Sequence, residues 1–261
     1  MRPSESYIER CRELLEAVSN QQDEIQKAAD LFAASILKGR VVHVFGSGHS
    51  RMLVEEMWPR YGSFPGWNPI VELSLTHHTP VVGANGQRQA MFLENVSGFA
   101  ARILRNFDLS TDDSAIVVSS SGCNVVPIEM AQEFQKRGIK VVAIIGAKHL
   151  EASTTKHPNG VKLSDVADIC LDTGIPPGDA MVKLENLDTP VAPGSTVGGV
   201  LLTNMIKAEV ADRLVRAGQP PRVLTSGCVI DPERARRLFE DAYDEHSHRL
   251  AKLYENVKEE D

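Results

Sequence analysis

The sequence has few of the features that mark secreted or metal-dependent small domains. Its 261 residues include only four cysteines, Cys11, Cys123, Cys170 and Cys228, and no two of them form a CxxC pair. This spacing supports neither a zinc knuckle nor a thioredoxin motif. A reduced, cytoplasmic compartment is therefore the expected location.

Long apolar runs and an excess of basic residues are also absent. No stretch approaches the ~18–20 apolar residues that a membrane span needs, and we expect no secretory signal because charges run through residues 1–18. Lys and Arg number 28 against 35 Asp and Glu, which gives a net charge of −7. This balance argues against a general nucleic-acid binder and against a polybasic membrane anchor.

What is present is an alternation of strand and helix patterns. Short β-branched or apolar runs predict five strands, at 41–45, 70–75, 115–118, 139–145 and 169–171. Apolar residues at 3–4 spacing predict helices between them, two more before the first strand (about 4–38) and one at the end (about 231–257). The pattern predicts an α/β fold: a three-layer sandwich with a five-stranded parallel sheet flanked by helices, in a single domain over 1–261. Residues 172–194 are expected to form a long ordered loop that can hold a short hairpin.

Polar loops follow three of the expected strands. Ligands bind beyond the carboxyl ends of the strands in such sheets, so the loops at 46–50, 75–80 and 119–124 should share one edge. The first loop, GSGHS, has small residues whose N–H groups suit an anion at a helix N-terminus. The alternative is a tight turn in which Ser50 only caps the helix. Arg51 stands where a dinucleotide fingerprint needs its third glycine, so NAD binding is not favoured.

The loop SSSGCN at 119–124 is the more specific feature. Its hydroxyl and N–H groups offer many donors to a phosphate, whereas capping alone needs one serine. It is not a Walker A loop, because no Gly-Lys-Ser/Thr follows. Ser195 and Thr196 open a later helix and either cap it or reach a ligand. The candidate phosphate-binding residues are Ser47, Gly48, His49, Ser50, Ser119, Ser120, Ser121, Gly122, Asn124, Ser195 and Thr196.

Together these three strand–loop–helix motifs resemble the sugar isomerase (SIS) domain family over residues 30–217. The stretches 127–131 and 156–168 resemble a small bacterial subfamily akin to phosphoheptose isomerase. The resemblance implies a flavodoxin-like SIS fold, a small phosphorylated sugar as ligand, and a homodimer or homotetramer with sites at subunit boundaries. In the family the phosphate loop usually ends in Thr or Ser, and here it ends in Asn124.

Isomerisation needs a base that moves a proton between C1 and C2 of the sugar. By resemblance, EEMWPRYG matches the phosphoheptose isomerase stretch that contains a catalytic Glu, which favours Glu56; an i,i+4 ion pair with Arg60 is the alternative. Glu94 is expected on the small-residue face of a helix over 92–104, and the related muramate-phosphate etherases keep a catalytic Glu in this region. For Glu94 the alternative is a solvated helical carboxylate.

Two histidines are candidate catalytic residues, and the one after the second strand is placed to open the sugar ring or to protonate a leaving oxygen. His78 follows the second strand at its carboxyl end, next to His77, and the alternative is a surface turn. His246 lies on the apolar face of the last helix, either as a buried histidine or, as in phosphoheptose isomerases, delivered to a site. Histidines and a Glu suit zinc by ligand type, but no spacing demands a metal, so we expect neither a metal nor a cofactor.

These residues predict a phosphosugar isomerase that acts through an enediol. The same residues also serve a lyase or etherase that expels a substituent from C3 of the sugar. A phosphosugar-binding module without catalysis is the third interpretation. It ranks below the others because the residues before 41 are too few to hold a helix-turn-helix domain as well as the expected helices.

Overall fold

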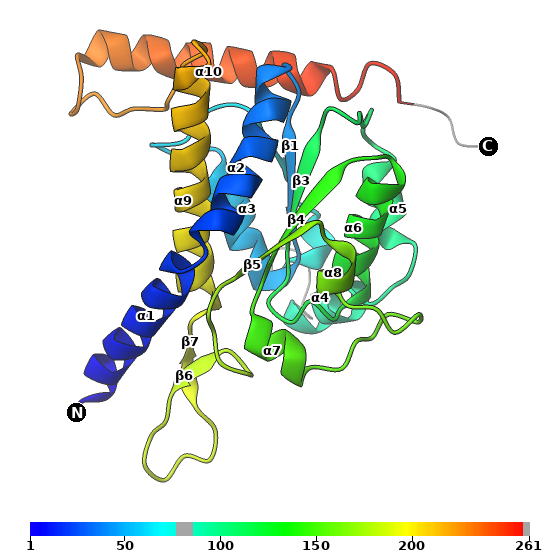
Figure 1. Ribbon diagram of the computed structural model, residues 1–261, viewed down its shortest axis with the longest axis vertical. Coiled ribbons are helices and arrows are strands. Elements are labelled where there is room, and N and C mark those ends of the chain that lie inside the picture. The colour runs from blue at the N-terminus through cyan, green and yellow to red at the C-terminus, as the bar shows by residue number, and fades with distance from the viewer. Residues whose placement is uncertain (77–85, 258–261) are drawn as a thin grey trace.

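A parallel sheet lies at the centre of the computed structural model, which describes residues 1–76 and 86–257 (Figure 1). Among these residues, five strands lie in the order β2-β1-β3-β4-β5, each parallel to its neighbours. They are β1 (Val42–Gly46), β2 (Trp67–Ile70), β3 (Ser114–Val118), β4 (Lys140–Ile145) and β5 (Ile169–Asp172). The predicted α/β architecture is confirmed.

Alternate side chains of the strands enter two separate cores. In β1, Val42 and Val44 belong to one core and Phe45 to the other. The first core is covered by α2 (Gln22–Leu37), α3 (Arg51–Met57), α9 (Ser195–Arg216) and α10 (Pro232–Ala251). The second is covered by α5 (Phe99–Leu104), α6 (Val125–Lys136) and α8 (Leu163–Val166). Because both faces of each strand are covered, the strands read as continuous apolar runs in the sequence.

The N-terminal helix and a hairpin project together from the body of the molecule (Figure 1). They are α1 (Pro3–Ser19) and the antiparallel pair β6 (Ala180–Val182) and β7 (Val191–Pro193). Leu14, Ile175 and Met181 form a small core between them, and the Tyr7 hydroxyl donates to the Pro193 carbonyl at 2.8 Å. The hairpin expected within residues 172–194 is therefore present.

Three predicted elements were wrong in their bounds. The second strand is Trp67–Ile70 rather than 70–75, and Leu73–Leu75 form a 3-10 turn, η2. The helix expected over 92–104 is two helices, α4 (Gln87–Leu93) and α5, because the chain turns between them at Gly98, whose φ is 84°. The last helix ends at Ala251 rather than near 257. In the described part of the chain, no helix has both the length and the apolar character to cross a membrane.

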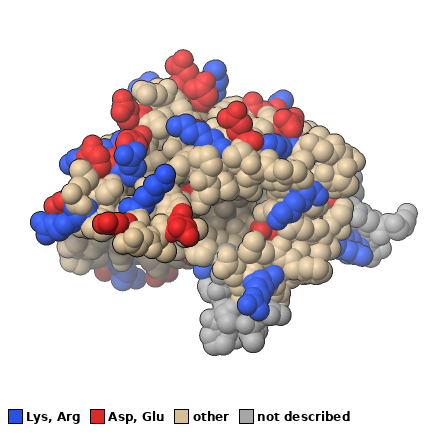
Figure 2. Space-filling view, turned by 90° about the horizontal axis from the view of Figure 1, so that it is seen from below, with Lys and Arg blue, Asp and Glu red and all other residues tan. Residues whose placement is uncertain are grey.

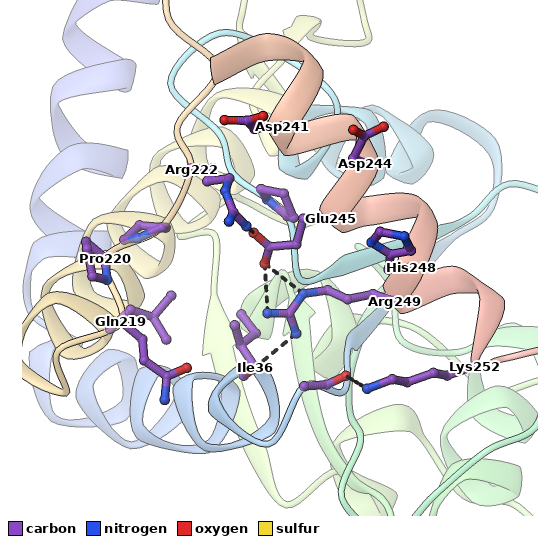
Figure 3. A pocket seen from close by; sticks show the side chains of 14 residues that line it. Ile36, Gln219, Pro220, Arg222, Asp241, Asp244, Glu245, His248, Arg249 and Lys252 are labelled. Atoms are coloured by element: carbon purple, nitrogen blue, oxygen red, sulfur yellow. Dashed lines mark hydrogen bonds and ion pairs between the residues drawn. The ribbon is translucent and has the colours of Figure 1, made fainter. Parts of the chain in front are cut away.

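Arg249 ties the C-terminal end of α2 to α10 (Figure 3). Its Nη1 donates to the carbonyls of Ile36 at 3.1 Å and Arg40 at 2.9 Å, and its Nε donates to Glu245 at 2.9 Å. These bonds satisfy carbonyl groups that a helix end leaves unpaired, and the cation complements the negative end of the helix dipole. A cavity of about 690 Å³ surrounds Arg249 where α2 meets α10. Arg222 and Lys252, which also line it, already have hydrogen-bond partners within the protein.

Replacing Arg249 with methionine should lower the free energy of unfolding by about 2 kcal/mol, because three hydrogen bonds that this charged, largely buried side chain donates are lost. Lys252→Met is the matched control, since Lys252 is exposed and its single hydrogen bond to another described residue goes to the Gly39 carbonyl, at 3.2 Å. Urea unfolding of both variants measures the difference. Equal free energies of unfolding for the two variants would show that Arg249 does not hold α2 and α10 together.

Candidate functional site

A cavity of about 290 Å³ lies at the carboxyl ends of β1 and β3. Figure 2 views the molecule from this end and shows a hollow in its surface. The loops at 46–50 and 119–124 line the cavity together, as a parallel sheet predicts. Most of the third expected loop, including His77 and His78, falls outside the described residues, so the role of His78 stays a prediction.

Several donors in the loop from Ser119 to Asn124 have no acceptor in the part of the chain that the structure describes. Gly122 N–H donates to Ser119 Oγ at 3.2 Å, and this turn requires the φ of 59° that glycine adopts readily. Among the described residues, the N–H groups of Ser120 and Ser121 and the Ser120 hydroxyl have no protein partner. The loop also opens the twelve-residue helix α6. These groups, with the positive end of the helix, suit an anion.

The GSGHS loop supplies the neighbouring wall of the cavity. A Cβ on Gly46 would lie 2.7 Å from the Ser50 carbonyl, so this tight turn requires glycine. Part of the loop is the 3-10 turn η1 (Gly48–Ser50). Ser50 stands at the N-cap of α3, but its side chain makes no capping bond, so the alternative that it only caps the helix is not supported. Ser47 turns its hydroxyl towards a carboxylate instead.

That carboxylate is Glu94, which is only 8% exposed. One oxygen accepts the Ser47 hydroxyl and the other accepts the Asn124 side-chain N–H, each at 2.7 Å. Burial raises the pKa of Glu94 above its ordinary value, against the opposing effects of the Ser47 bond and the charge of Lys156. Glu94 reaches the cavity from the C-cap of α4, so the prediction of a small-residue helical face was wrong although the residue lines the cavity.

The N-terminal end of α9 is already bonded to a carboxylate of the protein. Asp179 accepts the N–H groups of Gly194 at 3.0 Å and Ser195 at 2.7 Å, and it also accepts the Ser195 hydroxyl at 2.7 Å. Ser195 therefore helps to close the helix end, while the Thr196 hydroxyl lies 3.9 Å from the Met52 sulfur. Both residues line the cavity, but the positive end of α9 is already matched by a carboxylate.

Besides Asp179, two polar residues that line the cavity were missed from the sequence. His149 lies in α7 (Ala147–Ala152), just after β4, and its Nδ1 accepts the Gly178 N–H at 2.8 Å. A neutral ring held in this way carries its proton on Nε2. Thr173 follows β5 and is 3% exposed, and its hydroxyl has no partner among the described residues. Their position directly after a strand end was the signal that could have found both.

Glu56 does not line this cavity. It accepts bonds from Arg60 and from Asn204, the latter at 2.8 Å, and the Lys207 ammonium lies 3.8 Å away. Burial opposes its ionisation, but these partners together hold the pKa of Glu56 below its ordinary value. The alternative ion pair with Arg60 is thus formed, and the structure does not bring Glu56 together with the serine loop.

His246 lies at a different cavity, of about 630 Å³, beside β2. Its ring packs against Trp58 in a tilted arrangement, with 5.0 Å between centroids and 40° between ring planes, and its Nδ1 is buried without a partner in the described part of the chain. Burial and the charge of Arg249 lower the pKa of His246. The described residues hold no cluster of three or more His, Cys, Asp or Glu side chains suited to a metal ion.

The chain is similar in sequence to known proteins. A family model described as the SIS domain matches residues 6–146, and the chain therefore belongs to the SIS domain family. A UPF0309 protein of Listeria innocua is 33% identical to this chain, over 92% of this chain and 95% of that protein. A UPF0309 protein of Thermoanaerobacter pseudethanolicus is 35% identical over 85% of this chain and 89% of its own, and within the SIS proteins the chain falls in this group.

Solved structures are similar at lower identity. A phosphoheptose isomerase from Francisella tularensis is 16% identical, with a TM-score of 0.49 over 79% of this chain and 95% of that chain. The sugar isomerase domain of an RpiR transcription factor from Sphaerobacter thermophilus is 15% identical, with a TM-score of 0.45 over 91% of this chain and 93% of that chain.

Proposed function

We propose that the protein isomerises a small phosphorylated sugar, with the phosphate at the Ser119–Asn124 loop and Glu94 as the base. The observation that carries this proposal is the connection between Glu94 and the loop. The Glu94 side chain accepts a bond from Asn124, and its carbonyl accepts the Val126 N–H at 2.8 Å in the first turn of α6. A buried carboxyl is thus held at a fixed position beside an anion-binding loop.

The electrostatics favour one orientation of the ligand. Among the described residues no lysine or arginine lines the cavity, so the phosphate is held by N–H and hydroxyl dipoles. Glu94 and Asp179 repel a phosphate from the remaining walls, which directs it to the serine loop. The cavity volume of about 290 Å³ is at the small end of the range for ligand pockets and favours a compact sugar.

In the proposed reaction, the Glu94 carboxylate removes the proton from C2 of the open-chain aldose. The electron pair of that bond forms the C1–C2 double bond of an enediol, while O1 takes up a proton from a donor. Glu94 then returns its proton to C1, and the O2 hydroxyl gives its proton back to the group that donated to O1 as O2 becomes the carbonyl oxygen of the ketose. A carboxyl with a raised pKa is better suited both to take and to return this proton near neutral pH.

Proton NMR in D₂O with a panel of aldose and ketose phosphates tests the proposal. We expect deuterium to enter at the carbon next to the carbonyl of at least one of them. The corresponding sugars without phosphate are the control, and their signals should remain sharp and unexchanged. Broadened phosphosugar signals without deuterium would mean binding without catalysis, and release of an acid from C3 would assign a lyase instead.

His149 is the group that we propose as the proton donor to O1. Replacing it with asparagine should lower turnover by about 100-fold, because the Nε2–H donor is lost. The asparagine oxygen can still accept the Gly178 N–H, so the melting temperature should change little. Steady-state kinetics and thermal melting of the same preparation measure both effects. Unchanged turnover in His149→Asn would remove His149 from the mechanism.

A further inference from the structure

The segment between α7 and α8 brings a lysine to the edge of the candidate site. Lys156 Nζ donates to Asn124 Oδ1 at 2.9 Å, and Asn124 Nδ2 donates to Glu94 at 2.7 Å. One amide therefore joins an exposed ammonium to a buried carboxyl. The main chain fixes the same contact, because the Lys156 N–H donates to the Cys123 carbonyl at 2.8 Å, next to Asn124.

The chemistry of these groups determines how the amide is oriented. An ammonium group has only donors, so the oxygen of Asn124 must face Lys156. The NH₂ group of Asn124 then faces Glu94 and can only donate to it. An ionised Glu94 accepts this bond and the bond from Ser47, whereas a neutral Glu94 cannot give its proton to Asn124. Without Lys156 the amide is free to turn over and accept the proton of a neutral Glu94.

We propose that Lys156 is a positioning residue of the candidate site: by fixing the amide of Asn124 it keeps Glu94 a hydrogen-bond acceptor, and therefore a base. The role in catalysis rests on the proposed function. The bridge itself is a property of the protein alone and can be tested without a substrate. It also gives a reason for asparagine at the end of this loop, since one carboxamide supplies the acceptor for Lys156 and the donor for Glu94.

Other titratable groups near Glu94 come from several elements. In the described part of the chain the cavity is also lined by His49 of η1, His149 of α7 and Asp179, which precedes β6. Lys156 is the cation whose charge opposes the effect of burial on the pKa of Glu94. Its removal should therefore change the titration of Glu94 while these other groups stay in place.

Infrared difference spectroscopy of the full-length protein measures this titration. The C=O stretch of protonated Glu94 is isolated by subtracting the spectra of Glu94→Gln, and its amplitude is followed between about pH 4 and pH 9. We expect Lys156→Met to raise the midpoint by about one pH unit and Lys156→Arg to change it by a few tenths at most. Lys148→Met is the matched control, because it removes one charge from an exposed lysine of α7 that has no bond to Asn124.

An unchanged midpoint in Lys156→Met would overturn the proposal, and so would an equal shift in Lys148→Met, which would indicate a general effect of charge. Thermal melting confirms that each variant is folded. A shifted midpoint without turnover of any phosphosugar would retain the role of Lys156 and reject the isomerase. Turnover with the same pH–rate profile in Lys156→Met would retain the isomerase and reject the role of Lys156.

Discussion

Glu94→Gln should reduce deuterium incorporation into the phosphosugar by about 10²–10⁴-fold, the contribution of a positioned general base. Glutamine has the same shape and still meets both neighbours: its oxygen can accept the Asn124 N–H, and its NH₂ group can donate to the Ser47 oxygen. The phosphate loop is untouched, so binding of the sugar phosphate should persist. Deuterium exchange by NMR and ligand binding by calorimetry separate the two effects.

The same variant should be at least as stable as the wild type at neutral pH. Burial raises the pKa of Glu94, so the protonated form favours the folded state, and this contribution is lost as the pH rises through the raised value. Glutamine is uncharged at every pH, so the variant loses no such contribution as the pH rises. Thermal melting should show the difference at neutral pH and a smaller one below the ordinary pKa of glutamate.

Two neighbouring carboxylates on α3 serve as controls for Glu94. Glu55→Gln should change neither turnover nor stability, because the side chain is 54% exposed in a surface pair with Arg51. Glu56→Gln should lower stability, since it leaves the nearly buried Lys207 without its charged partner, yet keep turnover. Loss of exchange in Glu56→Gln with retention in Glu94→Gln would reverse the assignment of the base.

The parts of the site that follow from local sequence could be predicted. Four strands read as buried apolar runs because both of their faces are covered, and the serine loop lies between one such run and a helix. The rule that ligands bind beyond strand carboxyl ends then brought the loops at 46–50 and 119–124 together. Each of these inferences needed only a short stretch of chain and one general rule.

The second strand could not be read in this way. Residues 71–75 have the apolar character of a strand, but the strand that forms is Trp67–Ile70, with Pro69 inside it. Proline is tolerated there because β2 is at the edge of the sheet, and an edge position depends on the order of the strands. The apolar spacing over 92–104 wrongly predicted one continuous helix, because it counted Phe92 as part of a buried face. Phe92 is 71% exposed, and this depends on the folded chain.

The remaining site residues depend on contacts between distant segments. Asp179 bonds to Ser195 across the hairpin, and Lys156 bonds to Asn124 although α6, β4 and α7 lie between them in the sequence. Charged residues in loops have no periodicity, so their partners follow only from the folded chain. His149 lies at a strand end that the same rule covers, but it follows no glycine–serine loop that would have drawn attention to it.

Gly198→Ala should lower the free energy of unfolding by about 3 kcal/mol, the upper part of the usual range for an overpacked core position. A Cβ on Gly198 would lie 2.2 Å from the carbonyl oxygen of Thr173. That atom belongs to the backbone just after β5, so α9 must move away from the sheet to make room. Because Thr173 lines the cavity, affinity for the sugar phosphate should fall as well.

Gly199→Ala is the matched control, one position further along the same helix. The three atoms nearest its added Cβ would all belong to the side chain of Leu53, with Cδ2 at 2.5 Å, and a leucine side chain can change its rotamer. Both substitutions gain about 1 kcal/mol in helix propensity, so this contribution cancels in the comparison. Urea unfolding should therefore give a clearly lower free energy of unfolding for Gly198→Ala than for Gly199→Ala. Equal stabilities would mean that the contact between α9 and Thr173 yields easily, and that the wall of the cavity there is not rigid.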